Sequence, residues 1–349
     1  MKQNWFAAMI LAASVPMLSQ QPPKVINAQF QTKPVGAGLS ETVGQLQHSS
    51  GPFWLGYEVA AVPRSRFSFC SGDIQSTGDD RCCGVYRLED SDNSFQSSDG
   101  AEQVQTRMDV LVRVDQGAVD NIRFIGAGCS LDAGGLSFTW LTDVKSDDSI
   151  AWLSSQVTAE NRRHTDKALA AIAMHESTKA TAALEAFSSA SNQLWLKEKA
   201  GFWLGAERGH DGLLALERLR ADTDPEFRKK LSFDFSVSHD PAAVDDLIGL
   251  AKSDKDTGVR EQAIFWVAQK AGKKAVEALK DAVDNDPETA VKKKAVFALS
   301  QLPKDEAVPE LLHVAQTNAN LAIRKDAIFW LGQTHDPRAL AYFEQILEH

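Results

Sequence analysis

AIFWVAQ, residues 263–269, returns as AVFALSQ at 295–301 and as AIFWLGQ at 327–333. Weaker copies are AGFWLGA at 200–206, LSFDFSV at 231–237 and ALAAIAM at 168–174. Successive copies begin 31 or 32 residues apart. A near-fixed period of this size is typical of a solenoid, in which each repeat is one unit stacked on the next. The sequence therefore predicts a mainly α fold in which residues 150–349 form about six repeats of an α-solenoid.

Each repeat is predicted to contain two helices. The first runs like PAAVDDLIGLAK, residues 241–252, and the second like VREQAIFWVAQ, residues 259–269. The second helix is apolar almost all round, because Ala263, Trp266 and Val267 fall on one side and Phe265 near the other. Such a helix needs neighbours on several sides, and the adjacent repeat supplies them. We therefore predict inter-repeat core at the recurring phenylalanines: Phe202, Phe233, Phe265, Phe297 and Phe329.

The composition is that of a globular protein. The chain has 349 residues, of which 43% are hydrophobic and 24% charged, so it can bury a sizeable core. Its formal net charge is −10. A general nucleic-acid binder would need a clustered basic field, so we expect no nucleic-acid partner.

The N-terminus has the pattern of a secretory signal peptide. One Lys precedes an apolar run from Trp5 to Val15, which is too short to span a bilayer. We predict a signal peptide at residues 1–19, with cleavage either near Ser19 or near Ala28; the alternative is an ordinary buried helix. The mature chain would then be exported, periplasmic or secreted, without a membrane span. Residues 20–50 are rich in Gln, Pro, Gly and Ser and are predicted to form a flexible lead-in.

Residues 51–149 are predicted to form a small β-rich domain. MDVLVRV at 108–114 and VDNIRFI at 119–125 alternate in hydrophobicity around Gly117, which indicates a β-hairpin. All four cysteines lie here: Cys70, Cys82, Cys83 and Cys129. An even number in an exported chain predicts two disulfides, and a bridge within the adjacent pair is disfavoured by geometry. Cys70 and Cys129 would each pair with one of Cys82 and Cys83; a zinc site and a redox-active thiol are the alternatives.

The repeat units resemble those of HEAT-repeat proteins of the bilin-lyase-like subgroup. The match is carried by V-R-x-x-A-I-F-W-V-A-Q, I-R-x-x-A-I-F-W-L-G-Q and A-V-P-x-L-L, and it covers about residues 155–349. The N-terminal part resembles the front domain of exported bacterial HEAT-repeat proteins through a Cys-Cys-Gly segment and C-x-x-D-x-G-G at 129–135. The resemblance implies an armadillo-type α–α superhelix. Two enzyme groups share the repeat, the bilin lyases and deoxyhypusine hydroxylase. Deoxyhypusine hydroxylase binds metal through several His-Glu pairs, whereas this chain has only His175–Glu176, so the resemblance does not imply a metal site.

Two recurring positions are candidates for binding. Trp is replaced by Asp234 and Ala298 in two of the repeats, and a position that varies so widely is expected at an edge or on the concave face. The alternative is a half-buried Trp packed on the next repeat. A basic ladder also recurs, either to contact acidic segments of a partner or to pair with a carboxylate of its own or the adjacent repeat. The ladder comprises Lys197, Arg228, Arg260, Lys292 and Arg324. The candidate binding residues are Trp203, Trp266, Trp330, Arg260 and Arg324.

The sequence contains no H-E-x-x-H, G-x-S-x-G or Walker A motif, so we predict no catalytic residues, no metal and no cofactor. The predicted function is an exported scaffold, with a regulatory role as one version, whose superhelix holds a protein or peptide partner in the cell envelope. The alternative is a HEAT-repeat enzyme, a lyase or metal-dependent oxidoreductase, that depends on His175 and Glu176. A third hypothesis assigns recognition to the β-rich domain.

Overall fold

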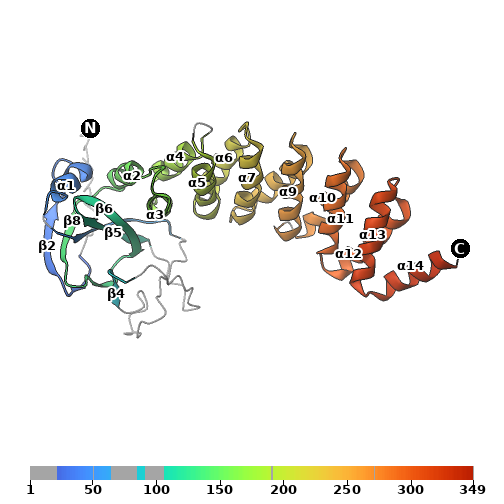
Figure 1. Cartoon of the computed structure of the whole chain (residues 1–349), viewed down its shortest axis with the longest axis horizontal. Helices are drawn as coiled ribbons and strands as arrows, with labels where there is room; N and C mark the ends of the chain where they lie inside the picture. Colours follow the sequence, from blue (N-terminus) through green and yellow to red (C-terminus); the bar gives the residue numbers. More distant parts are fainter. Residues whose placement is uncertain are drawn as a thin grey trace, which may run out of the picture.

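The computed structural model describes residues 22–49, 51–63, 85–90, 106–189, 192–270 and 272–348. In these residues a sheet-containing N-terminal part leads into a row of helices that ends at the C-terminus (Figure 1). The predicted signal peptide and three of the cysteines, Cys70, Cys82 and Cys83, lie outside the described residues. None of the described helices is both long and apolar enough for a bilayer crossing.

The helices alternate between two rows. Their bounds are α2 Ser146–Ser155, α3 Arg162–Met174, α4 Thr178–Phe187, α5 Leu194–Glu207, α6 Gly209–Leu219, α7 Pro225–Val237, α8 Ala243–Ser253, α9 Thr257–Lys270, α10 Lys273–Asn285, α11 Thr289–Ser300, α12 Lys304–Thr317, α13 Leu321–Thr334 and α14 Pro337–Leu347. The six sequence copies fall on α3, α5, α7, α9, α11 and α13, which we call the odd row. Each helix of the odd row contacts the next one in that row, and α4, α6, α8, α10, α12 and α14 form the even row beside it. The predicted solenoid of paired helices is confirmed.

Helix α9 shows why the repeat sequence folds this way. Val259, Ala263 and Val267 are fully buried, whereas Phe265 and Trp266 stay half-exposed. The helix contacts α8 and α10 of the even row, and α7 and α11 of its own row. A helix flanked on so many sides needs apolar residues around most of its circumference, and the sequence supplies them.

Among the described residues of the N-terminal part, eight strands form two sheets. The strands are β1 Val25–Ile26, β2 Gln29–Pro34, β3 Phe53–Ala60, β4 Val85–Arg87, β5 Arg107–Asp115, β6 Ala118–Gly126, β7 Ser130–Asp132 and β8 Ser137–Thr142. The larger sheet has the order β2-β8-β3-β5-β6 and the smaller β1-β7-β4. The predicted hairpin is β5–β6, and its two turn residues, Gln116 and Gly117, both have positive φ, as a tight hairpin turn requires.

The lead-in differs from the prediction. Residues 20–50 contain β1, β2 and helix α1 (Leu39–Leu46) within the part that the structure describes. Strand β2 pairs in parallel with β8 over its whole length, although five of its six side chains are exposed. Its order comes from backbone hydrogen bonds at a sheet edge, which a search for hydrophobic periodicity does not detect.

The sheet and the helices share one core. One face of β3 and β5, including Leu55, Tyr57 and Val112, belongs to the same buried cluster as the helices. The opposite face, with Trp54, packs under the smaller sheet. The β-rich part is therefore a layer of the same body rather than a separate small domain. Cys129 is buried and is not a free thiol, but a partner for it is not among the described residues, so the disulfide pairing stays a prediction.

A buried chain of hydrogen bonds joins the sheet to the first helices. The Nε2 atom of His175 lies 2.9 Å from Ser149 Oγ, which in turn lies 2.9 Å from the hydroxyl of Tyr57. The Nδ1 atom of His175 lies 2.7 Å from the carbonyl oxygen of Ala171, so Nδ1 carries the proton and donates it there, and the ring is neutral. All three polar side chains are fully buried. The arrangement locks strand β3 to α2 and α3.

His175 predicts a loss of stability in acid. Burial lowers the pKa of His175 to about 4, below its ordinary value of 6.5. The stability that the neutral ring contributes is therefore complete above pH 6.5 and is lost as the pH falls toward 4, by about 3 kcal/mol. We expect His175→Gln to remove this part of the pH dependence, as measured by urea unfolding between pH 7 and pH 4.

The matched control is His210→Gln, because the His210 side chain is exposed on α6. That variant should keep the acid-dependent loss. Equal pH dependence in His175→Gln and the wild-type chain would contradict the assignment.

Candidate functional site

Buried ion pairs join consecutive repeats. Arg228 on α7 holds Asp254 through two hydrogen bonds, of 2.9 Å and 3.0 Å. One repeat further on, Arg260 on α9 holds Asp286 in the same way, at 2.7 Å and 3.1 Å. The side chains of both pairs are at most 7% exposed. Arg260 is therefore not available to a partner, and of the two interpretations of the basic ladder the pairing with a carboxylate of the adjacent repeat is confirmed for it.

Each of these aspartates also shapes a turn. Asp286 accepts a hydrogen bond of 2.8 Å from the backbone N–H of Glu288, just before α11 begins. Arg260 donates with its remaining terminal nitrogen to the carbonyl oxygen of Asp254, at 2.9 Å. One arginine thus binds its own entering turn and the entering turn of the next repeat. Because three donors of the guanidinium are satisfied, the charge tolerates burial.

The ladder changes at its C-terminal end. The aspartate position recurs at Asp222, Asp254, Asp286 and then Asn318. Lys292 has no carboxylate there and donates instead to the carbonyl oxygen of Asp284, at 2.7 Å. Arg324 donates to the carbonyl oxygen of Asn318, at 2.7 Å, and among the described residues it has no carboxylate partner. The 32-residue spacing of these aspartates is a signal from which the sequence could have predicted the pairing.

The recurring aromatic residues are all at least partly exposed on the odd row. We call this set the aromatic face: Phe202, Trp203, Phe233, Phe265, Trp266, Phe297, Phe329 and Trp330. The ring centroids of Trp266 and Phe233 lie 4.9 Å apart, across neighbouring helices of the row. Phe202, Phe233 and Phe297 each contact a ring of a neighbouring odd helix, but none of the five phenylalanines is fully buried. Phe329 is 57% exposed, so the prediction of inter-repeat core is wrong for this residue.

The three predicted tryptophans share this face but not the same neighbours. Trp330 packs on Phe297 of the preceding odd helix, at 5.0 Å between centroids. Trp203 lies edge-on to Phe202 of its own helix, at 5.0 Å. All three are half-buried. Trp266 and Trp330 also pack on a ring of another repeat, which is the alternative interpretation of this position.

The Trp position is buried where the sequence replaces it. Asp234 is 2% exposed and Ala298 1%, so the expectation that this position lies at an edge is wrong for these two residues. Asp234 lies against α5, where Gly201 and Gly205 leave no room for a side chain: a Cβ at Gly205 would lie 2.3 Å from the Asp234 carbonyl oxygen. The small residues let α5 and α7 approach, and the approach buries the carboxyl.

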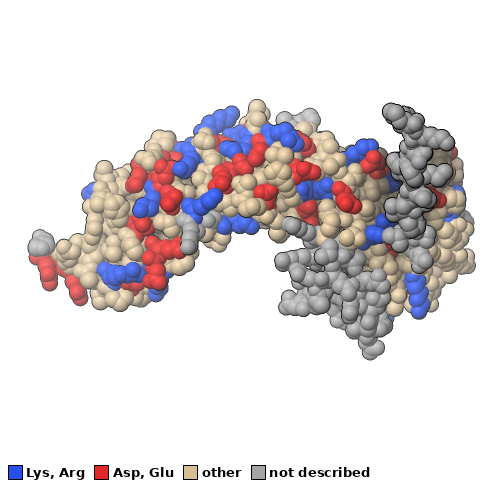
Figure 2. Space-filling model, turned by 180° about the vertical axis from the view of Figure 1, so that it is seen from behind, with Lys and Arg blue, Asp and Glu red and all other residues tan. Residues whose placement is uncertain are grey.

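Lysines flank the aromatic face. Lys294 lies 5.7 Å from the ring centroid of Phe265 and 5.4 Å from that of Phe297. Helix α11 has three lysines and no carboxylate, whereas α12 of the even row has one lysine and three carboxylates. Over the array as seen from behind, acidic and basic residues are intermixed, and the surface is hollowed below its middle (Figure 2). Helix α11 therefore pairs apolar rings with positive charge.

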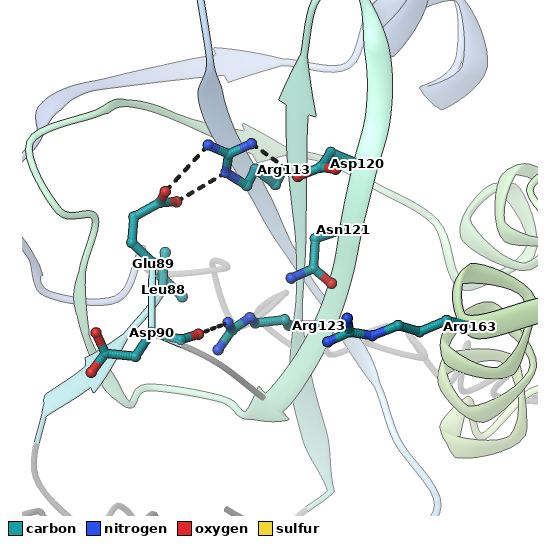
Figure 3. A pocket seen from close by; sticks show the side chains of 8 residues that line it. All are labelled: Leu88, Glu89, Asp90, Arg113, Asp120, Asn121, Arg123 and Arg163. Atoms are coloured by element: carbon teal, nitrogen blue, oxygen red, sulfur yellow. Dashed lines mark hydrogen bonds and ion pairs between the residues drawn. The ribbon is translucent and has the colours of Figure 1, made fainter. Parts of the chain in front are cut away.

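A cavity of about 300 Å³ lies where the hairpin meets the helices. Figure 3 shows its lining, in which Arg163 extends from α3 toward Arg123 of β6. Arg113 of β5 is neutralised there by a double hydrogen bond to Glu89, at 3.1 Å and 3.2 Å. Sequence reasoning missed this cavity, because residues from three separate segments line it and none stands in a recognisable spacing.

No group of three potential metal-ligating side chains gathers anywhere in the described part of the chain. His175 of the predicted enzymatic pair is engaged in the buried junction, and its neighbour Glu176 lies at the start of the following turn.

Comparison with known proteins supports the repeat type. Residues 213–300 and 276–349 match the family model of HEAT repeats, so the array contains HEAT repeats. No curated protein sequence matches the chain.

Three solved structures illustrate the likeness. The complex of CpcE and CpcF of phycocyanin lyase from Nostoc sp. PCC7120 is 22% identical, covering 44% of this chain and 99% of that chain, with a TM-score of 0.34. Human deoxyhypusine hydroxylase is 18% identical, covering 57% and 90%, with a TM-score of 0.31. Kap121p is 12% identical, covering 58% and 27%, with a TM-score of 0.37. Similarities this low carry no argument about function.

The basic ladder predicts that replacing Arg by Ala lowers the free energy of unfolding by different amounts at different repeats. Arg260→Ala leaves the buried carboxylate of Asp286 without its partner, so it should lower the free energy of unfolding by about 3 kcal/mol. Arg324→Ala removes only hydrogen bonds to backbone carbonyls and should cost about 1 kcal/mol. Urea unfolding of both variants measures the difference; equal losses would contradict the pairing.

Asp234 predicts the opposite pH dependence from His175. Burial, with the nearby charge of Glu198, raises the pKa of Asp234 well above its ordinary value of 3.8. The stability that the protonated Asp234 carboxyl contributes is therefore fully present below pH 3.8 and is lost as the pH rises through the raised pKa of the folded chain. Asp234→Asn should stabilise the chain at pH 7, by about 1–3 kcal/mol, and have a smaller effect at pH 4.

Asp305→Asn is the control, because the Asp305 side chain is fully exposed. It should change stability little at either pH. If Asp234→Asn raised the free energy of unfolding equally at pH 4 and pH 7, ionisation of the Asp234 carboxyl would not be what destabilises the folded chain.

Proposed function

We propose that the chain is a protein-binding scaffold whose aromatic face holds an acidic, apolar segment of a partner protein. The observation that carries the proposal is the row of partly exposed rings on the odd helices. Ring contacts link α5, α7 and α9, and a further contact links α11 to α13, with Lys294 lying between Phe265 of α9 and Phe297 of α11. Proteins built of HEAT repeats commonly present extended surfaces to other proteins. The aromatic face provides such a surface with a defined chemistry.

Aromatic rings suit this role because they offer a large contact area. A ring that is already packed on one side loses little side-chain freedom when a partner covers the other side. Trp266 and Trp330 are held in this way by the rings of the preceding repeat. The buried arginine–aspartate pairs fix the spacing of the helices underneath. The surface is therefore organised before a partner arrives.

Charge favours an acidic partner. Lys294 lies between two rings of the aromatic face and, among the described residues, forms no ion pair with a carboxylate. Lys230 and Lys293 lie nearby and bind Glu198 and Asp326 with partly exposed side chains. A carboxylate from a partner can exchange with such surface pairs at little cost. Helices α8 and α12 of the even row have more carboxylates than cations and would repel the same segment.

The cellular location and the disulfides of the chain are also proposals. We propose that the chain is exported and meets its partner in the cell envelope, and that disulfides join Cys70 and Cys129 to Cys82 and Cys83. The short apolar run at Trp5–Val15 and the even number of cysteines support this setting.

A displayed library of random peptides provides the test. Selection on the chain should enrich peptides that combine Asp or Glu with Leu, Phe or Trp. The affinity of an enriched peptide, measured by fluorescence anisotropy, should fall about tenfold or more in Lys294→Glu, because the substitution places a negative charge among the rings.

Lys304→Glu makes the same charge change on α12 of the even row and should leave the affinity unchanged. Enrichment of basic peptides, no enrichment, or equal affinity for Lys294→Glu and the wild-type chain would each contradict the proposal.

A further inference from the structure

The C-terminal end of the array exposes an apolar surface on two helices. Leu340, Ile346 and Leu347 of α14 are 59%, 44% and 85% exposed. Leu321 and Phe329 of α13 are 55% and 57% exposed. Figure 1 shows α14 extending past α13, with no described element beyond it. Most of the large exposed hydrophobic side chains of the described chain gather here, and such concentration marks an interaction surface.

The same end has charges of both signs without ion pairs. Arg324 and Lys325 lie at the beginning of α13, and among the described residues neither has a carboxylate partner. Glu344 lies in the last turn of α14 and Glu348 directly after it, and no described cation binds either of them. Further into the array, the equivalents of Arg324 do hold carboxylates, as Arg228 and Arg260 show. The end thus offers two unpaired cations and two unpaired carboxylates on adjacent helices.

A two-fold symmetric dimer requires a surface that is complementary to itself, and apolar residues beside unpaired charges of both signs meet the chemical part of that requirement. A two-fold axis brings the same patch of two subunits together, so that residue i meets residue j and j meets i. The cations of α13 in one copy then face the carboxylates of α14 in the other, twice. Packing of α14 against its counterpart covers the leucines that it leaves exposed.

We propose that a second copy of this chain docks on α13 and α14, forming a two-fold symmetric dimer through the C-terminal end of the array. Arg324 and Lys325 of each copy bind Glu344 and Glu348 of the other, around an apolar centre that includes Leu340 and Leu347. The dimer places two aromatic faces in one assembly, so a partner with two acidic segments gains affinity from both.

Charge reversal tests the pairing directly. One variant replaces both cations, Arg324→Glu with Lys325→Glu, and a second replaces both carboxylates, Glu344→Lys with Glu348→Lys. Sedimentation velocity of the chain without a C-terminal tag should show a dimer for the wild type. For each variant alone, the dissociation constant of the dimer should rise about tenfold or more, because like charges then face each other at both contacts.

Mixing the two variants should restore the dimer, since opposite charges then meet at both contacts. This rescue distinguishes the interface from simple damage to the fold. Leu347→Asp should also weaken the dimer, whereas Leu214→Asp on α6, a half-exposed leucine away from this end, should not. A monomeric wild-type chain, or a dimer that both charge-reversed variants leave intact, would overturn the proposal.

Discussion

A charge that is buried between two helices must be bound on every side, and this requirement organises the array. Arg260 meets it by holding Asp286 of the next repeat and the carbonyl oxygen of Asp254 at the same time. The helix that contains the arginine, the turn before it and the turn that leads into the next helix of the odd row are thereby fixed in one arrangement. Arg228 repeats the arrangement one unit earlier, so the geometry of one junction is passed to the next.

The arrangement of the aromatic face depends on these buried ion pairs. With the helices of the odd row held at a constant spacing, the rings that follow each arginine along its helix reach those of the neighbouring helix. Rings that touch across repeats become one surface rather than separate residues. The array therefore uses one face of each odd helix to stack and the other to present aromatic and basic groups.

The sequence predicted the elements with a clear period and failed where contacts are distant. The spacing of the AIFWVAQ copies placed the odd row correctly, because every copy must satisfy the same neighbours. Arg260 and Arg324 occupy equivalent positions in the sequence, yet one is buried and the other lies at the end of the ladder. Strand β2 escaped prediction because its pairing with β8 joins residues more than one hundred positions apart. Asp234 was misplaced because its burial depends on two glycines of another helix.

The β-rich layer and the array are also less separable than the sequence suggests. Tyr57 of β3, Ser149 of α2 and His175, beyond the end of α3, share one buried hydrogen-bonded chain. A core continuous from the sheet to the last repeats implies that both parts fold and unfold together at this junction. Recognition by the array thus rests on a support that includes the sheet.

Hydrogen exchange, followed by mass spectrometry with and without a bound acidic segment, is the most direct test of the central claim. The account predicts slower exchange in α9, α11 and α13, where the aromatic face and its lysines lie. Protection confined to β3, β5 and β6, or to the even row, would contradict it, because recognition would then use a different surface.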